Sequence, residues 1–146
     1  MDMSKYEMTD QPVFFQLSDP STGLPLFEQK DDDGRKVDDP DNPVGVMIVG
    51  SDSEEFKRHM RRVTNKNLEA SQKRRGKGMS AEELEEESQV TLAACIKEFH
   101  HIEWKGKTLV APADCRLFIR VMPWAAEQID RGMAERKIFM PALSKS

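Results

Sequence analysis

The sequence predicts an α+β fold that is mainly α-helical, with about four helices and a small N-terminal antiparallel β element. Short runs rich in Val, Phe and Ile come first, at 13–17, 24–28 and 44–49, and such runs between turn residues favour strands. From residue 52 onward, apolar residues recur at three- and four-residue intervals, as they do on one face of a helix. The length of 146 residues suits one domain.

The periodicity divides the chain into three parts. Residues 1–12 have no period and little to bury, so we expect a mobile N-terminal arm. Residues 13–140 form a single domain, with the β element at 13–49 and a helical part at 52–140. Residues 141–146 follow as a C-terminal tail.

An acidic stretch at 31–43 falls between the second and third strand-like runs. In a calcium-binding EF-hand loop, oxygen ligands stand at positions 1, 3, 5 and 12 around a Gly at position 6. With Gly34 as that glycine, Asp31 and Asp33 fit, but Gln29 and Pro40 occupy the first and last ligand positions. Asp33-Gly34 is instead a strong hairpin-turn signal, so we interpret the stretch as a solvated hairpin tip.

The first helix is expected from about Ser53 to the region of Arg75. Phe56, Met60 and Val63 form one apolar stripe on its first half, which predicts that this half packs on something. The second half is nearly all polar.

The second helix begins with a capping box, Ser80 with Glu83. Its apolar spacing continues to about Trp104, and we expect one helix over that whole length. A short helix from Ala113 and a last helix from Pro123 complete the prediction, since proline suits a first helical turn.

No catalytic or ligand-binding motif stands out. His100 and His101 are adjacent, so on a helix they point about 100° apart and do not make a zinc pair. Cys95 and Cys115 lack metal-ligand spacing, and we interpret them as buried free thiols. We therefore expect a protein that is not an enzyme and has no metal or cofactor. No apolar run approaches the roughly 20 residues that span a bilayer, so we expect no membrane partner.

Charge is strongly segregated along the chain. Residues 57–77 hold nine basic residues and one acid, and 82–87 hold five glutamates. The two blocks either attract each other as two helices of a hairpin or attract separate partners. If the basic block grips nucleic acid, the candidate residues are Lys57, Arg58, Arg61, Arg62, Arg74 and Arg75. A pI of about 5.5 makes nucleic acid an unlikely partner.

Large apolar side chains late in the chain are candidate partner anchors. Met occurs nine times, and its flexible side chain suits surfaces that adapt to varied apolar segments. Aromatic residues and Met also carry much interface energy when they are exposed. The candidate anchors are Trp104, Trp124, Phe139 and Met140.

The order of these features resembles the tail assembly chaperones of long-tailed bacteriophages (siphophages) and prophages. The resemblance covers roughly 13–140. Its segments are DPSTGLPL, VGVMIVGSDS running into EEFKRHMRR, SAEELEEESQVTLAACIKEF, and IEWKGKTLVAPADCRLFIRVMPWAAEQIDR. Trp104, the turn from Lys105 to Lys107, and Trp124 match the family's order of a Trp, a short glycine turn and a helix pair with a second Trp.

The resemblance implies a non-catalytic factor in the cytoplasm of the bacterial host. Such a factor binds the tape measure protein, keeps its apolar helices soluble and helps tail tube protein assemble around it. Two other hypotheses remain open. The protein is a structural neck or tail protein of the virion, or it is a regulator that binds nucleic acid through the basic residues at 57–77. An oligomer is compatible with each of them.

Overall fold

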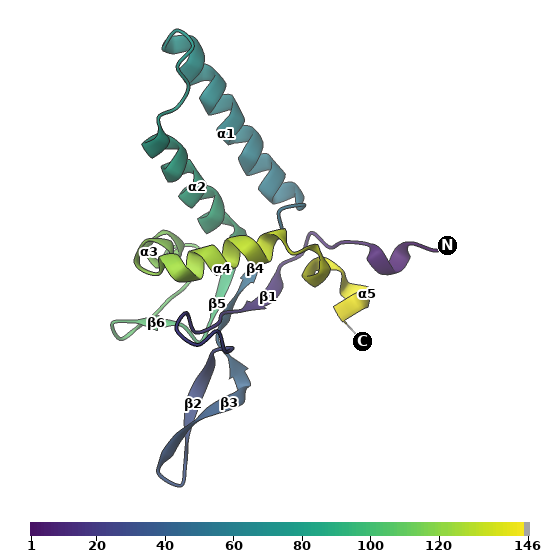
Figure 1. Ribbon diagram of the computed structural model, residues 1–146, viewed down its shortest axis with the longest axis vertical. Coiled ribbons are helices and arrows are strands. Elements are labelled where there is room, and N and C mark those ends of the chain that lie inside the picture. Colours follow the sequence, from purple (N-terminus) through teal and green to yellow (C-terminus); the bar gives the residue numbers. More distant parts are fainter. Residues whose placement is uncertain (145–146) are drawn as a thin grey trace.

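A computed structural model describes residues 1–144 of the protein. At its centre is β4 (Gly45–Ile48), which lies between β1 (Val13–Gln16) and β5 (Ile96–His100) in a three-stranded antiparallel sheet (Figure 1). Val46 pairs with Phe15 of β1 and with Phe99 of β5. The fold is α+β, as predicted.

The core lies where this sheet meets α3 (Cys115–Val121) and α4 (Pro123–Ala134). Burying one large aliphatic side chain contributes about 1.5–3 kcal/mol, so the sheet and these two helices hold most of the apolar stabilisation. The largest fully buried side chains are Leu17, Val46, Ile48, Val49, Cys95, Ile96, Leu109, Cys115, Ile129, Met133 and Phe139.

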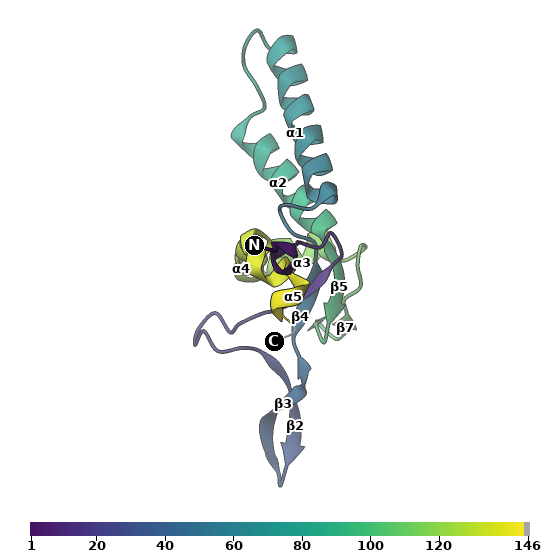
Figure 2. The same ribbon diagram turned by 90° about the vertical axis from the view of Figure 1, so that its right-hand side faces the viewer.

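Strands β2 (Phe27–Asp32) and β3 (Arg35–Pro43) form a two-stranded ribbon that projects from the body (Figure 2). Asp33 and Gly34 both have positive φ, of 50° and 81°, as the tightest hairpin turns require. The predicted hairpin tip is therefore confirmed. The run at 24–28 does not join the main sheet as a full strand. Its contacts are isolated ones: Pro25 forms a single antiparallel bridge with Ser18, and Leu26 donates its N–H to the Leu17 carbonyl and accepts from the Val44 N–H.

Two helices fill the connection between β4 and β5. The first, α1 (Glu54–Lys73), begins where the Ser53 hydroxyl accepts from the Phe56 N–H at 3.2 Å. The second, α2 (Ala81–Cys95), begins with the predicted capping box: Ser80 Oγ accepts from Glu83 N–H, and the Glu83 carboxylate accepts from Ser80 N–H. In Figure 1 this helical hairpin extends to the opposite end of the molecule from the β2–β3 ribbon.

The predicted continuation of the second helix to Trp104 is wrong. Helix α2 ends at Cys95, and the next five residues form β5. The apolar positions Ile96 and Phe99 suit a helix face and also a half-buried strand, and pairing with β4 decides between the two. Strands β6 (Glu103–Trp104) and β7 (Lys107–Thr108) follow, so the part at 52–140 is not purely helical and strands are not confined to the N-terminal end.

Helix α4 packs closely beside strand β1 and the residues that follow it. Gln128 makes a two-point contact with the backbone of Ser18: its Oε1 accepts from the Ser18 N–H at 2.8 Å, and its Nε2 donates to the Ser18 carbonyl at 2.9 Å. Gly132 leaves room for the Phe15 ring, which a Cβ there would approach to 2.6 Å. The helix is therefore fixed at a small distance from β1.

The N-terminal arm contacts the C-terminal segment. The arm contains η1 (Ser4–Tyr6), and the Thr9 N–H donates to the Phe139 carbonyl at 2.8 Å. On the other side, η2 (Arg136–Phe139) and α5 (Pro141–Ser144) follow α4. The hydrogen bond at Thr9 thus attaches the second half of the arm predicted at 1–12 to the C-terminal segment. Residues 145 and 146 of the predicted tail lie outside the described residues.

Cys95 and Cys115 are buried free thiols, as predicted. Burial raises the pKa of Cys95 to about 12 and the pKa of Cys115 to about 11. Because the thiolate is the reactive form, both side chains behave as small apolar groups at neutral pH.

The close approach of β1 to β4 gives a stability test. A Cβ at residue 45 would lie 2.2 Å from the Phe15 carbonyl oxygen, so Gly45→Ala must push the two strands apart. We expect the free energy of unfolding, measured by urea denaturation, to fall by about 1–3 kcal/mol. The control Gln72→Ala, on the exposed surface of α1, is expected to stay within about 0.5 kcal/mol of wild type. Unchanged stability of Gly45→Ala would contradict this strand packing.

Candidate partner-binding groove

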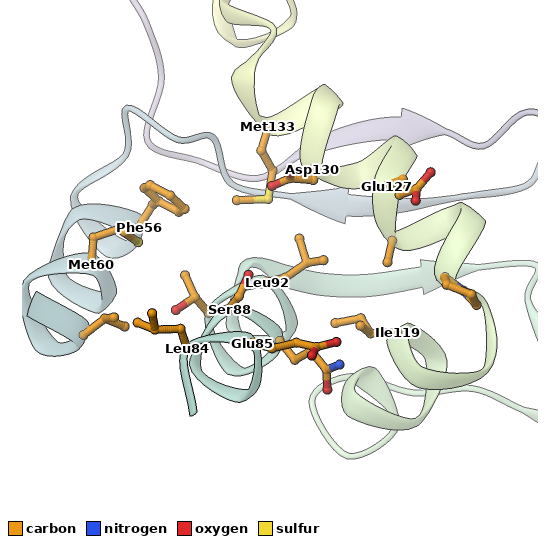
Figure 3. Close-up of a pocket in the computed structure, with 15 residues that line it drawn as sticks. Phe56, Met60, Leu84, Glu85, Ser88, Leu92, Ile119, Glu127, Asp130 and Met133 are labelled. Atoms are coloured by element: carbon orange, nitrogen blue, oxygen red, sulfur yellow. The ribbon is translucent and has the colours of Figure 1, made fainter. Parts of the chain in front are cut away.

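The helical hairpin and helix α4 enclose an open groove with a volume of about 640 Å³. In Figure 3, Phe56 and Met60 of α1 lie on one side, Asp130 and Met133 of α4 lie on another, and Leu92 of α2 lies between them. Four helices contribute to the lining, because Ile119 of α3 also reaches it.

Each wall is one face of a helix. Residues lining the groove recur at helical spacing on all three long helices. The α1 wall is the apolar stripe of Phe56, Met60 and Val63, which the sequence predicted to be a packing face. The lining is Phe56, Met60 and Val63 from α1; Leu84, Glu85, Ser88, Gln89, Thr91 and Leu92 from α2; and Pro123, Ala126, Glu127, Asp130 and Met133 from α4.

The groove leaves large apolar side chains in contact with solvent. Met60 is 42% exposed and Leu84 is 44% exposed. Single exposed apolar residues are ordinary, but several that converge on one hollow mark an interaction surface. We therefore regard the groove as the candidate functional site.

The rim of the groove is acidic. Glu85, Glu127 and Asp130 are its charged members, and no basic side chain from the described part of the chain lines it. None of the three makes an ion pair within 4.0 Å with any of residues 1–144. The groove thus combines apolar walls with three uncompensated carboxylates.

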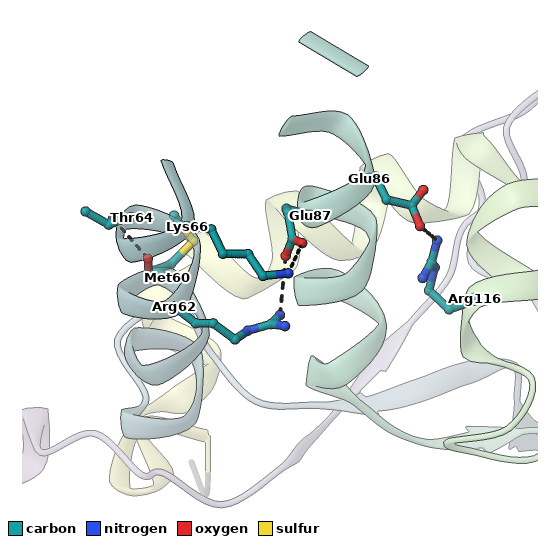
Figure 4. A network of polar contacts seen from close by, with 7 residues as sticks. All are labelled: Met60, Arg62, Thr64, Lys66, Glu86, Glu87 and Arg116. Carbon is teal, nitrogen blue, oxygen red and sulfur yellow. Dashed lines mark hydrogen bonds and ion pairs between the residues drawn. The ribbon is translucent and has the colours of Figure 1, made fainter. Parts of the chain in front are cut away.

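One buried hydroxyl in the lining has no partner. Thr91 is 4% exposed, and its Oγ1 makes no hydrogen bond. By contrast, the Thr64 hydroxyl of α1 donates to the Met60 carbonyl at 3.0 Å (Figure 4). Buried polar groups are normally satisfied, so the Thr91 hydroxyl is an exception, enclosed in the wall of the groove.

Ion pairs hold α1 to α2 on a separate face of the hairpin. Lys66 Nζ lies 2.5 Å from Glu87 Oε1, and Arg62 lies 3.5 Å from Glu87 Oε2 (Figure 4). Further up, Arg74 pairs with Glu83 at 2.7 Å. We call these contacts the polar seam. The hydrogen bond from Lys66, with the charges of Lys66 and Arg62, lowers the pKa of the mostly buried Glu87.

The seam divides the predicted basic patch. Arg62 and Arg74 face the glutamates of α2, and Arg61 pairs with Glu54 at 3.9 Å. Lys57, Arg58 and Arg75 make no ion pair with a residue that the structure describes. Along a helix with 1.5 Å rise per residue, Arg58 and Arg74 are about 24 Å apart. The six residues are therefore spread along the length of α1, and three of them are paired within the chain.

The four predicted anchors do not lie in the groove. Phe139 is 1% exposed and packs in the core beside Gly50, so it is unsuitable as a surface anchor, and this expectation is corrected. Trp104, Trp124 and Met140 are half-buried. Trp104 carries the Lys105 ammonium 4.7 Å above its ring. The sequence did not predict that the residues lining the groove remain exposed to solvent. The acidic residues Glu127 and Asp130, next to the apolar positions of the last helix, were the feature that could have indicated it.

The described residues offer neither a metal site nor a membrane-spanning helix. No group of three or more His, Cys, Asp or Glu side chains is arranged to hold a metal ion. None of the described helices has the length and apolar character needed to cross a bilayer.

The polar seam predicts a pH dependence. Because the folded-state pKa of Glu87 is lowered from its ordinary value of 4.5, its contribution to stability is complete above that value. The contribution is lost as pH falls through the folded-state pKa. The free energy of unfolding of Glu87→Gln should therefore be lower than that of wild type at about pH 7, and the difference between the two should shrink at about pH 3. Urea denaturation at both pH values measures this.

Glu85→Gln is the matched control on the same helix, since it removes no ion pair. A Glu87→Gln difference that is the same at both pH values would show that the pairs with Lys66 and Arg62 do not form in solution.

Comparisons of the chain with protein-family models, curated proteins and solved structures found no match.

Proposed function

We propose that the protein is a non-catalytic phage tail assembly chaperone that acts in the host cytoplasm. In this proposal it binds a helical segment of the tape measure protein in the groove and assists assembly of the tail tube protein around it. The open apolar groove is the observation that carries the proposal. The sequence resemblance to this family of chaperones supports it.

A helix is the occupant that the walls of the groove fit best. Binding sites for amphipathic helices are hydrophobic grooves that receive apolar side chains spaced by one helical turn. The α1 wall itself repeats at that spacing through Phe56, Met60 and Val63. Met60 and Met133 add flexible side chains that adapt to different client residues.

The charged surroundings suit a chaperone that must stay soluble with an apolar client. The β2–β3 ribbon and the helical hairpin extend in opposite directions and are largely exposed. The net charge of −4 on the whole chain opposes association between loaded complexes, while the client helix is shielded in the groove between the helical hairpin and α4.

The proposal predicts a complex in cells. The tagged protein is co-expressed with the proteins encoded immediately downstream, and the complexes are purified and identified by mass spectrometry. We expect recovery of a very long, helix-rich protein that is more soluble than when expressed alone. If no such protein is recovered, and the chain is found at stoichiometric copy number in purified virions, the protein is a structural component of the virion and not a chaperone.

The double variant Met60→Glu with Leu84→Glu tests the groove itself. Both side chains are exposed in the free protein, so folding should be retained while the client loses apolar contact. We expect client affinity to fall by about tenfold or more, since each buried anchor contributes on the order of 1–2 kcal/mol. The control is Leu68→Glu, because Leu68 is 56% exposed on α1, the helix of Met60, and lies outside the groove. Equal losses in the control and the double variant would exclude the groove.

A further inference from the structure

The carboxylates on the rim of the groove differ from the acids of α2 that contact the neighbouring helices. On α2, Glu83, Glu86 and Glu87 each pair with a cation of α1 or α3: Glu83 with Arg74, Glu86 with Arg116, and Glu87 with Lys66 and Arg62. Glu85 stands on the same helix and faces the groove without a cation. The acids that hold the helices together are therefore paired, whereas Glu85 at the groove, like Glu82 outside it, makes no ion pair with a described residue.

The three rim carboxylates surround the position that an occupant would take. Glu127 and Asp130 are three residues apart on α4, so they lie on one face, and Glu85 belongs to α2 (Figure 3). A helix lying on the apolar floor would therefore have acidic side chains on both flanks. An occupant with Lys or Arg beside its apolar stripe would pair with them, whereas one with Glu or Asp there would be repelled.

We infer that the groove selects an amphipathic helix whose apolar stripe is flanked by Lys and Arg. This deepens the proposed function, on which it rests, by defining which segment of the client is bound.

The flexible ends of basic side chains make this pairing compatible with a shallow site. Lys and Arg lay their apolar stems on an apolar surface while their charged heads reach the rim. Exposed ion pairs are individually weak, and their effect is weakened further by salt. The three carboxylates therefore act on the choice of client and on the rate of association, and their effect is largest at low salt.

The test uses the whole protein and two synthetic helical peptides of about 20 residues. Both carry the same Leu and Ala stripe at helical spacing, and their flanking positions are all Lys in one peptide and all Glu in the other. We expect the Lys peptide to bind about tenfold more tightly at low salt, measured by fluorescence anisotropy, with a difference that shrinks as salt is raised.

The triple variant Glu85→Lys, Glu127→Lys and Asp130→Lys should reverse this preference. Its control, Asp10→Lys with Asp32→Lys and Glu103→Lys, makes the same change in net charge at exposed positions outside the groove and should keep the wild-type preference. Equal affinity for the two peptides, no binding of either, or the same response in both triple variants would overturn the inference.

The outcome is separable from that of the proposed function. If wild type prefers the Lys peptide but recovers no tape-measure-like protein from cells, the groove has the inferred chemistry and the function is wrong. Suppose instead that the wild-type protein recovers a tape-measure-like protein, and that the variant with Glu85→Lys, Glu127→Lys and Asp130→Lys binds it with unchanged affinity. The proposed function then stands and the inference fails. Binding of a small apolar molecule or of a second copy, with no peptide bound, would also count against it.

Discussion

The pairing of β4 with β5 is the interaction on which the rest of the structure depends. Val46 opposite Phe99 and Ile48 opposite Ile96 join segments about 50 residues apart, and all of α1 and α2 lies between them. Closing so large a loop costs entropy that only the non-local ladder and its core contacts offset. The Val49 N–H extends the ladder by donating to the Cys95 carbonyl at 3.1 Å, where α2 ends.

The way in which α1 and α2 contact each other explains why a groove exists. Two amphipathic helices usually bury their apolar stripes against each other. Here the polar seam, centred on Glu87 with Lys66 and Arg62, makes part of that contact. The stripe at Phe56 and Met60 is consequently turned toward α4, which Gln128 and the core hold in place. Electrostatic contact between the two helices thus leaves apolar surface available to a partner.

Features encoded by neighbouring residues could be predicted from the sequence, and those that depend on distant segments could not. The capping box at Ser80 and the turn at Asp33 are local, so both were predicted correctly. The end of α2 was missed because Ile96 and Phe99 fit a helix equally well until β4 is present. The groove was missed for a similar reason, since the exposure of Met60 depends on the angle between helices, which no single segment encodes.

The β2–β3 ribbon has a consequence for how such a chain tolerates change. Beyond Phe27 and Pro43, where it joins the body, its residues are mostly exposed and contribute little to the core. Strand register repeats every two residues, so residues added or removed in pairs on both strands preserve the pairing and the turn. The ribbon is therefore free to vary in length and charge without altering the groove, and its tip offers a place for an inserted epitope or fluorescent label far from the helices.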